Sequence, residues 1–388
     1  MNLWRRVASL VLGLTAGLML AGCWSSKEID QLSVLIGVAL DRNESKNAAS
    51  EGRLEVTIQT LTTGASSLNS QGQGQTTSKP YINMIATGNS VYEAIREMSL
   101  RTDKPPIGHH LKAIVVSADL AKHNSLENLL DFFMRDNDIR PGSLVFVSSG
   151  QANRVFELKR SEEIPSFHMA GITENRYRTS KILPPTTLGK IKGEIKGGSS
   201  MLLPNIIVRD GKLKLSGAGV IRGKTKKLVG LLSEEEVLGV VWATGSGKGG
   251  VMSAVDPATK RPLVYEVNSM HSTIRSFVSG DRVSFNVSIR SIGRMMENWS
   301  KPEESSNQQF LDDQTKLFER KILDLVEQTI EKVQRQYKTD VLGFGDRLRI
   351  EHPRAWERLK ANWDERFAEA DIRTDVKIRI EDYGLVVE

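Results

Sequence analysis

The chain of 388 residues contains very little cysteine and histidine. Cys23 is its only cysteine, so an internal disulfide is excluded and the fold must depend on packing. Of the six histidines, only His109 and His110 stand together. Adjacent residues of a strand point to opposite faces, and no histidine or carboxylate follows this pair at a metal-binding spacing. The sequence therefore indicates neither a disulfide framework nor a metal site.

Motifs of catalysis are missing as well. Residues 245–249 (GSGKG) superficially resemble a phosphate-binding loop. However, Lys248 is followed by Gly249 instead of serine or threonine, and Trp242 stands where the first glycine of the motif should be. The sequence has no Gly-x-Ser-x-Gly elbow, and its only thiol belongs to Cys23. We therefore expect a protein that is not an enzyme and that holds no cofactor.

Long apolar runs are absent after the first 22 residues. The chain begins with MNLWRR, and an apolar run follows over residues 7–21. This run is too short for a stable membrane span, which needs about 20 apolar residues. A charged start, an apolar centre and small residues before a cut site are typical of an export signal. We therefore expect residues 1–22 to be a signal peptide.

Residues 20–23 (LAGC) look like the lipobox of bacterial lipoproteins. Cleavage between Gly22 and Cys23 would make Cys23 the first residue and the acceptor of a diacylglyceryl group. The alternative is an ordinary secretory peptide with an incidental cysteine. We favour the lipid anchor, because the only thiol of the chain lies where a lipid acceptor must lie. Two acyl chains hold a protein on a membrane durably, whereas one chain holds it marginally.

The charge balance is mildly basic, with a net charge of +6 at pH 7. A mild excess of this kind can favour an anionic membrane surface. No basic stripe interleaved with aromatic residues is present, so we expect no nucleic-acid partner. The densest basic cluster, residues 224–227 (KTKK), is more typical of a solvated hairpin turn.

The mature chain is longer than one hydrophobic core usually organises, so two or three domains are expected. We place a signal peptide at 1–22, an N-terminal α/β domain at 23–198, a strand-rich middle domain at 199–270 and a C-terminal α+β domain at 271–388. The expected class is α+β: an N-terminal mixed sheet with helices, a small strand-rich middle part, and a C-terminal sheet packed on long amphipathic helices.

The periodicity of apolar residues supports this architecture. Helical spacing predicts helices at 89–98, 125–135 and 307–337, and another that begins at Pro353. Alternation or short apolar runs predict strands at 32–40, 53–59, 111–117, 143–148, 201–208, 212–221, 227–232, 282–290 and 375–381. Residues 62–80 are rich in serine, threonine, glutamine and glycine, which predicts a loop.

Several segments together resemble the Ger(x)C family, the lipoprotein C subunits of spore germinant receptors. The likeness begins at the mature N-terminus, GCWSSKEIDQLSVLIGVALD, and continues in order almost to the end of the chain. The other matching segments are LLDFFMRDNDIRP (129–141), LSGAGVIRGKTKKLVGLLSEEEVLGVVW (215–242), GFG (343–345), HPRAW (352–356) and NWDERF (362–367).

The resemblance implies a role without a reaction. It implies a lipid anchor at Cys23 on the outer face of the spore's inner membrane, next to integral-membrane A and B subunits. It also implies that the complex responds to small nutrients, whereas whether this subunit binds nutrient itself stays open. A solute-binding lipoprotein of a nutrient transporter is the alternative function, and it would require two similar lobes around a deep cleft.

Other motifs have a structural and a functional interpretation. Phe132 and Phe133 are either core or contact surface, and we favour core. Arg135, Asp136 and Arg140 form either a structural charge network or a partner interface, and we favour structure. Residues 234–236 (EEE) are more typical of a helix N-terminus than of a cation site. The helical spacing of Trp356 and Trp363 favours core over a ligand platform.

Overall fold

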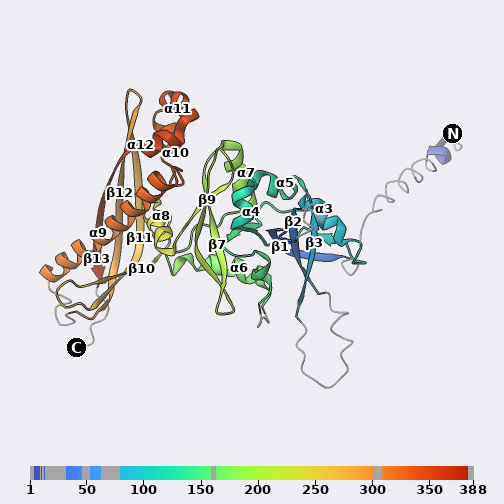
Figure 1. The fold of residues 1–388 in the computed structure, drawn as a ribbon, viewed down its shortest axis with the longest axis horizontal. Helices are drawn as coiled ribbons and strands as arrows, with labels where there is room; N and C mark the ends of the chain where they lie inside the picture. The colour runs from blue at the N-terminus through green and yellow to red at the C-terminus, as the bar shows by residue number, and fades with distance from the viewer. Residues whose placement is uncertain are drawn as a thin grey trace, which may run out of the picture.

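The computed structural model describes residues 32–45, 53–62, 79–158, 163–300 and 308–382, together with seven positions between residues 4 and 13. Two β-sheets lie one after the other along the molecule, the larger built from the first part of the chain and the smaller from the last part (Figure 1). The mixture of helices and two sheets confirms the α+β class.

The larger sheet has nine strands in the order β3-β2-β1-β5-β6-β7-β8-β9, with β4 paired to β1. Strands β1, β5 and β6 are parallel to one another, and β2 and β3 are antiparallel additions at one edge. The strands are β1 Ser33–Arg42, β2 Leu54–Leu61, β3 Tyr81–Gly88, β4 Pro106–Ile107, β5 Ala113–Ser117, β6 Leu144–Ser148, β7 Met201–Arg209, β8 Lys212–Ile221 and β9 Leu228–Leu232.

Helices cover both faces of this sheet, as expected for buried parallel strands. One face packs on α3 (Val91–Met98), α4 (Ala118–His123), α5 (Leu126–Arg135) and α7 (Leu188–Gly197). The other face packs on the 3₁₀ turn η2 (Asn153–Phe156) and on α6 (Pro165–Glu174), which continues into the 3₁₀ turn η3 (Asn175–Tyr177).

The smaller sheet has four strands in the order β10-β11-β12-β13. They are β10 Gly250–Val255, β11 Pro262–Ser279, β12 Arg282–Asn298 and β13 Asp371–Asp382, and β13 runs parallel to β12. Helix α9 (Gln308–Glu331) lies across this sheet and ends in a π-helical turn, η5 (Lys332–Gln336) (Figure 1). The short helices α10 (Phe344–Glu351), α11 (Pro353–Leu359), η6 (Lys360–Asn362) and α12 (Trp363–Glu369) then lead to β13.

Helix α8 (Glu234–Thr244) joins the two sheets. Its residues from Val237 to Ala243 are all buried, because one side packs on β8 and the other packs on α9 and β11. One continuous hydrophobic core therefore extends from Ala218 and Val220 of the larger sheet through α8 to Phe285 and Val287 of the smaller sheet.

The two halves approach closely at Gly230 in β9, where the ring of Tyr337 packs on the backbone. A Cβ atom at this position would lie 2.2 Å from the ring of Tyr337, so only glycine fits there without movement. The Tyr337 hydroxyl donates a hydrogen bond to the carbonyl of Leu231 at 2.8 Å. The two sheets are thus held together by specific contacts as well as by the shared core.

Residues 199–270 contribute to both sheets. Strand β7 pairs with β6 through Val147 and Asn205, so β7 to β9 extend the larger sheet. Strand β11 passes through residue 270, where a boundary was expected. The domain boundaries at 198 and 270 stay a prediction. A pattern of short strands in the sequence does not reveal which sheet each strand joins.

The helix expected to begin at Pro353 is broken into α11, η6 and α12. The turn at Lys360–Asn362 redirects the chain, so Trp363 reaches the buried carboxylate of Asp340. The prediction of one continuous helix was therefore wrong. The apolar residues have helical spacing in the sequence, but the tertiary contact of Trp363 interrupts the helix.

Candidate functional site

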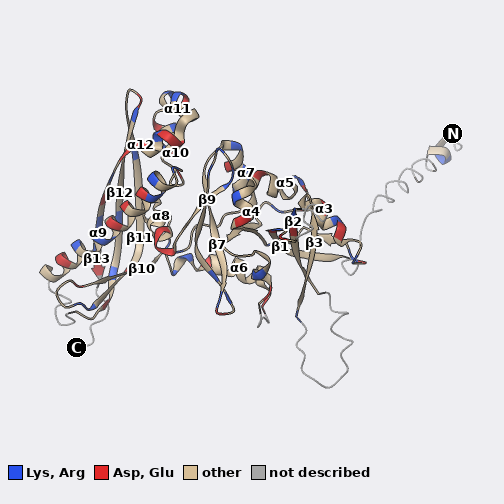
Figure 2. Ribbon diagram, viewed as in Figure 1, with Lys and Arg blue, Asp and Glu red and all other residues tan. Residues whose placement is uncertain are grey.

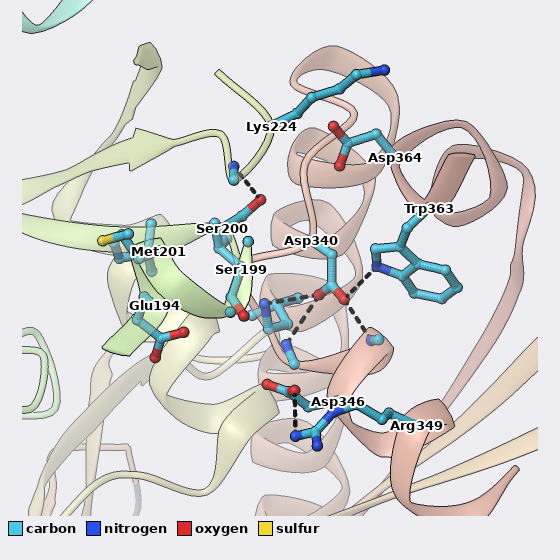
Figure 3. A pocket seen from close by; sticks show the side chains of 18 of the residues that line it. Glu194, Ser199, Ser200, Met201, Lys224, Asp340, Asp346, Arg349, Trp363 and Asp364 are labelled. Atoms are coloured by element: carbon cyan, nitrogen blue, oxygen red, sulfur yellow. Dashed lines mark hydrogen bonds and ion pairs between the residues drawn. The ribbon is translucent and has the colours of Figure 1, made fainter. Parts of the chain in front are cut away.

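A cleft of about 1010 Å³ lies between the two halves of the molecule. One wall consists of α7, the turn that follows it and the β8–β9 turn. The opposite wall consists of the segment from Asp340 to Asp346 and of α10 to α12. Figure 3 shows side chains from both walls, with Glu194 and Ser200 on one side and Asp340 and Trp363 on the other.

The buried carboxylate of Asp340 organises the second wall. It accepts hydrogen bonds from the backbone N–H groups of Leu342, Gly343, Phe344 and Gly345, at 2.6–3.2 Å, and from Nε1 of Trp363 at 3.0 Å. These amides belong to the start of α10, where backbone donors lack partners within the helix. Burial raises the pKa of Asp340 above its usual value, and the N–H donors oppose that rise because they stabilise the ionised form.

The two tryptophans form the aromatic part of this wall. The ring centroids of Trp356 and Trp363 lie 5.4 Å apart in an edge-to-face arrangement, and Trp363 also packs on Phe285 and Phe367. Both tryptophans are partly buried against the main core, which confirms their interpretation as core residues. Both also line the cleft, so the ligand platform and the core are not exclusive alternatives here.

Charged groups of both signs line the rest of the cleft. Asp346 and Arg349 form an ion pair at 3.1 Å on the helical wall (Figure 3). At the other end, Asp364 faces Arg222, with 3.7 Å between carboxylate and guanidinium. Burial raises the pKa of Asp364, and the positive charge of Arg222 partly opposes that rise. These groups suit the binding of a polar ligand or segment.

Arg222 also ties the two halves together. Its guanidinium donates to the carbonyl of Tyr337 at 2.7 Å and to the hydroxyl of Thr339 at 3.3 Å. Neither Arg222 nor Asp340 was among the residues singled out from the sequence. Asp340 stands three residues before Gly343, the N-cap of α10, so the usual capping signal at the N-cap position does not mark it.

The residues predicted for lipidation and cleavage, Cys23 and Gly22, lie outside the described part of the chain. Within that part, no helix is both long and apolar enough to cross a bilayer. Over the same residues, no group of three histidine, cysteine or carboxylate side chains could hold a metal ion. His109 lies 3.4 Å from Asp138 on the surface.

The helix start predicted for residues 234–236 is confirmed. The hydroxyl of Ser233 accepts from the N–H of Glu236, and the Glu236 carboxylate accepts from the N–H of Ser233. This is a capping box, and Lys332 of η5 adds an ion pair to Glu236 at 2.7 Å. Burial raises the pKa of Glu236, but the bonds from Lys332 and Ser233 outweigh it and hold the pKa below its usual value.

The loop at residues 245–249 has a structural role. Gly245 adopts a left-handed conformation and ends α8. A Cβ atom at Gly249 would lie 2.3 Å from the carbonyl oxygen of Tyr177, so this loop packs closely on the segment after α6. The glycines of this loop therefore serve the helix end and the close packing, and they do not form a phosphate-binding cradle.

The aromatic part of the FF-x-RD segment agrees with the preferred interpretation, whereas its charged part agrees only in part. Phe133 is buried, and Phe132 is half-buried with its ring centroid 5.3 Å from that of Tyr92. Arg135 pairs with Asp131 at 2.7 Å instead of with Asp136. The predicted pairing of Arg135 with Asp136 was therefore wrong, whereas Asp136 does have a structural role, since its carboxylate accepts from the N–H of Asp138 at 2.8 Å.

Comparison with known proteins identifies the class of this fold. The description "Spore germination protein N-terminal domain" matches residues 25–208, and "Spore germination B3/GerAC like, C-terminal" matches residues 216–384. The crystal structure of the GerBC protein superposes with a TM-score of 0.61 at 25% identity, covering 91% of this chain and 99% of that one. The architecture is therefore that of a spore germination protein.

Relatives of Bacillus subtilis (strain 168) match along almost their whole length. Spore germination protein YndF is 37% identical, covering 99% of this chain and 98% of its own length. Spore germination proteins B3 and A3 are each 30% identical, covering 95% of this chain and 96% and 95% of their own lengths. The chain belongs to the GerAC-like family of spore germination proteins, which confirms the family resemblance.

Proposed function

We propose that this protein is the lipid-anchored C subunit of a spore germinant receptor. The observation that carries the proposal is the continuous match to spore germination proteins, which begins two residues after a lipobox-like cysteine. The named relatives are spore germination proteins, which supports this function over a solute-binding lipoprotein of a transporter. The two unlike sheets also differ from the two similar lobes that a solute-binding protein would need.

In this proposal the protein acts by position and catalyses no reaction. Two acyl chains at Cys23 confine it to the outer face of the spore's inner membrane, beside the integral-membrane A and B subunits. Confinement to a thin layer raises its effective concentration against these partners, so weak contacts between the subunits suffice. The rigid connection through α8 lets a contact on either half position the whole molecule.

The first prediction tests the anchor through a Cys23→Ala substitution. The fold should be unchanged, because no described residue depends on Cys23, while membrane retention and nutrient-triggered germination should both be lost. Fractionation of spores and a germination assay measure the two effects, with Ser25→Ala as the matched control. A soluble Cys23→Ala protein that supports a normal nutrient response would contradict the proposal.

A further inference from the structure

The smaller sheet has one face that no described element covers. Helices α8, α9 and α10 all pack on its other face, where Phe285, Val287 and Val376 are buried. Side chains alternate along a strand, so the residues between these buried ones point to the opposite side. Figure 1 shows α9 lying across the sheet, and the uncovered face is the one turned away from it.

Basic side chains are concentrated in the middle of this uncovered face. Arg290 of β12 lies between two neighbours in register, His271 of β11 and Lys377 of β13. Residues opposite each other on paired strands have side chains about 5 Å apart, and like charges at this distance destabilise a sheet. Arg290 and Lys377 are therefore like charges side by side, and within the described part of the chain only Lys377 has an acidic partner, Glu319 of α9.

More cations lie in other rows of this face, two or four residues along the strands from Arg290. Arg275, Asn286 and Arg373 form one such row, and Arg379 lies beside Ile292 in another. Figure 2 shows lysine and arginine distributed along these strands.

The cations of β13, which is an edge strand of the sheet, have acidic partners. Arg373 lies 3.5 Å from Asp371, Lys377 lies 3.6 Å from Glu319, and Arg379 pairs with Glu381. Asp375 lies among the cations and accepts a hydrogen bond from Ser288 at 2.7 Å.

Arg275 and Arg290 differ from these neighbours. Both are exposed, and within the described ranges neither guanidinium has a hydrogen bond or an ion pair. A guanidinium presents a planar fork of donors that matches a carboxylate in two parallel hydrogen bonds. The two arginines therefore offer unused donors from two neighbouring strands of the sheet.

We propose that this uncovered face binds a carboxylate-rich segment of another protein. Its central cations complement clustered carboxylates, and hydroxyl and amide groups of Thr273, Ser288 and Asn286 lie between them as additional hydrogen-bonding groups. The proposal does not depend on lipidation of Cys23.

A protein segment fits this face better than a membrane does. The strands of a sheet are twisted relative to one another, so a flexible segment can follow the face whereas a flat bilayer cannot. Arg290 also lies in the middle of β12, whereas the tip of the hairpin at residues 279–282 carries one acid and one cation, Asp281 and Arg282. A bilayer approaching the sheet would meet the hairpin tip and the acidic edge residues before it met Arg290.

The test measures binding of a fluorescein-labelled deca-glutamate peptide to the full-length chain in a nonionic detergent by fluorescence anisotropy. The double variant Arg275→Glu/Arg290→Glu should bind the peptide at least about tenfold more weakly, because it replaces two attractive contacts by repulsive ones. The matched control is Lys196→Glu/Lys212→Glu, which makes the same change in net charge at exposed lysines of the other half and should change affinity less than about twofold.

Thermal unfolding establishes that the double variant is folded, and its stability should not fall because the substitutions relieve repulsion. An unbound peptide, or an equal loss in the control variant, would overturn the proposal. The proposal would also be overturned if lysophosphatidylglycerol micelles bound through Arg275 and Arg290 while the peptide did not bind. The partner would then be a lipid surface.

Discussion

At the residue scale, Asp340 shows how one buried carboxylate can order a functional wall. Its oxygens receive four backbone N–H groups and one indole N–H, so it fixes both the start of α10 and the place of Trp363. Without this acceptor, several buried donors would have no partner. The lining of the cleft therefore depends on Asp340 more than on any exposed charge around it.

An Asp340→Asn substitution should destabilise the protein by about 2–3 kcal/mol. The amide keeps the volume but brings an NH₂ group against N–H donors, so part of the donor set loses its acceptor. Denaturant unfolding measures the effect, and Asp346→Asn on the exposed rim is the matched control, with an expected change below about 0.5 kcal/mol. Equal effects of both substitutions would contradict this account.

Single residues were predicted from the sequence where their role is local. Ser233 with Glu236 was predictable, because a cap depends on neighbours three residues apart. Arg222 was not, because its partners Tyr337 and Asp364 lie more than a hundred residues away. The cleft could not be predicted for the same reason, since both walls meet only after the two halves have packed together.

At the element scale, α8 connects the two sheets and its first turn is also an electrostatic contact between them. Glu236 caps the helix and pairs with Lys332 of η5, so the same carboxylate stabilises both the helix start and the packing of α8 on the π-helical turn after α9. The bonds to the ionised form hold its pKa below the usual value despite burial.

This pairing predicts a pH dependence of stability. Because the pKa of Glu236 is lower in the folded state, its contribution is fully present above the unfolded value of about 4.3 and is lost as pH falls through the folded pKa. Glu236→Gln should lower the free energy of unfolding by about 1–2 kcal/mol at pH 7 and make little difference at pH 3. Denaturant titrations across this range check it, with the more exposed Glu235→Gln as control. A difference that stays constant with pH would show that the carboxylate charge is not responsible.

Elements with clear local signals were predicted well. The helix expected at 125–135 is α5, capped by Ser125, and the strand expected at 212–221 coincides with β8. Helix α7 was missed, because its glycines at 189, 193 and 197 resemble the punctuation of a domain boundary. Strand β12 extends well past its predicted end at residue 290, because Ser291 and Gly293 take the buried positions there and the alternation of apolar residues stops.

At the scale of the whole molecule, the structure connects two different sheets through one core. The larger sheet follows the predicted mixed architecture, and the smaller sheet follows the predicted packing on amphipathic helices. How the middle strands divide between them was not predictable, because β7 joins β6 through a single pair of residues. This arrangement gives a rigid body with a cleft on its seam and an uncovered basic face at one end.

The central claim is that this rigid body is held on the membrane by lipid at Cys23. Mass spectrometry of the mature protein isolated from spores tests it most directly. The account predicts a chain whose first residue is Cys23 and whose thiol carries a diacylglyceryl group. A mature chain with an unmodified Cys23 thiol, or one that retains residues 1–22, would contradict it.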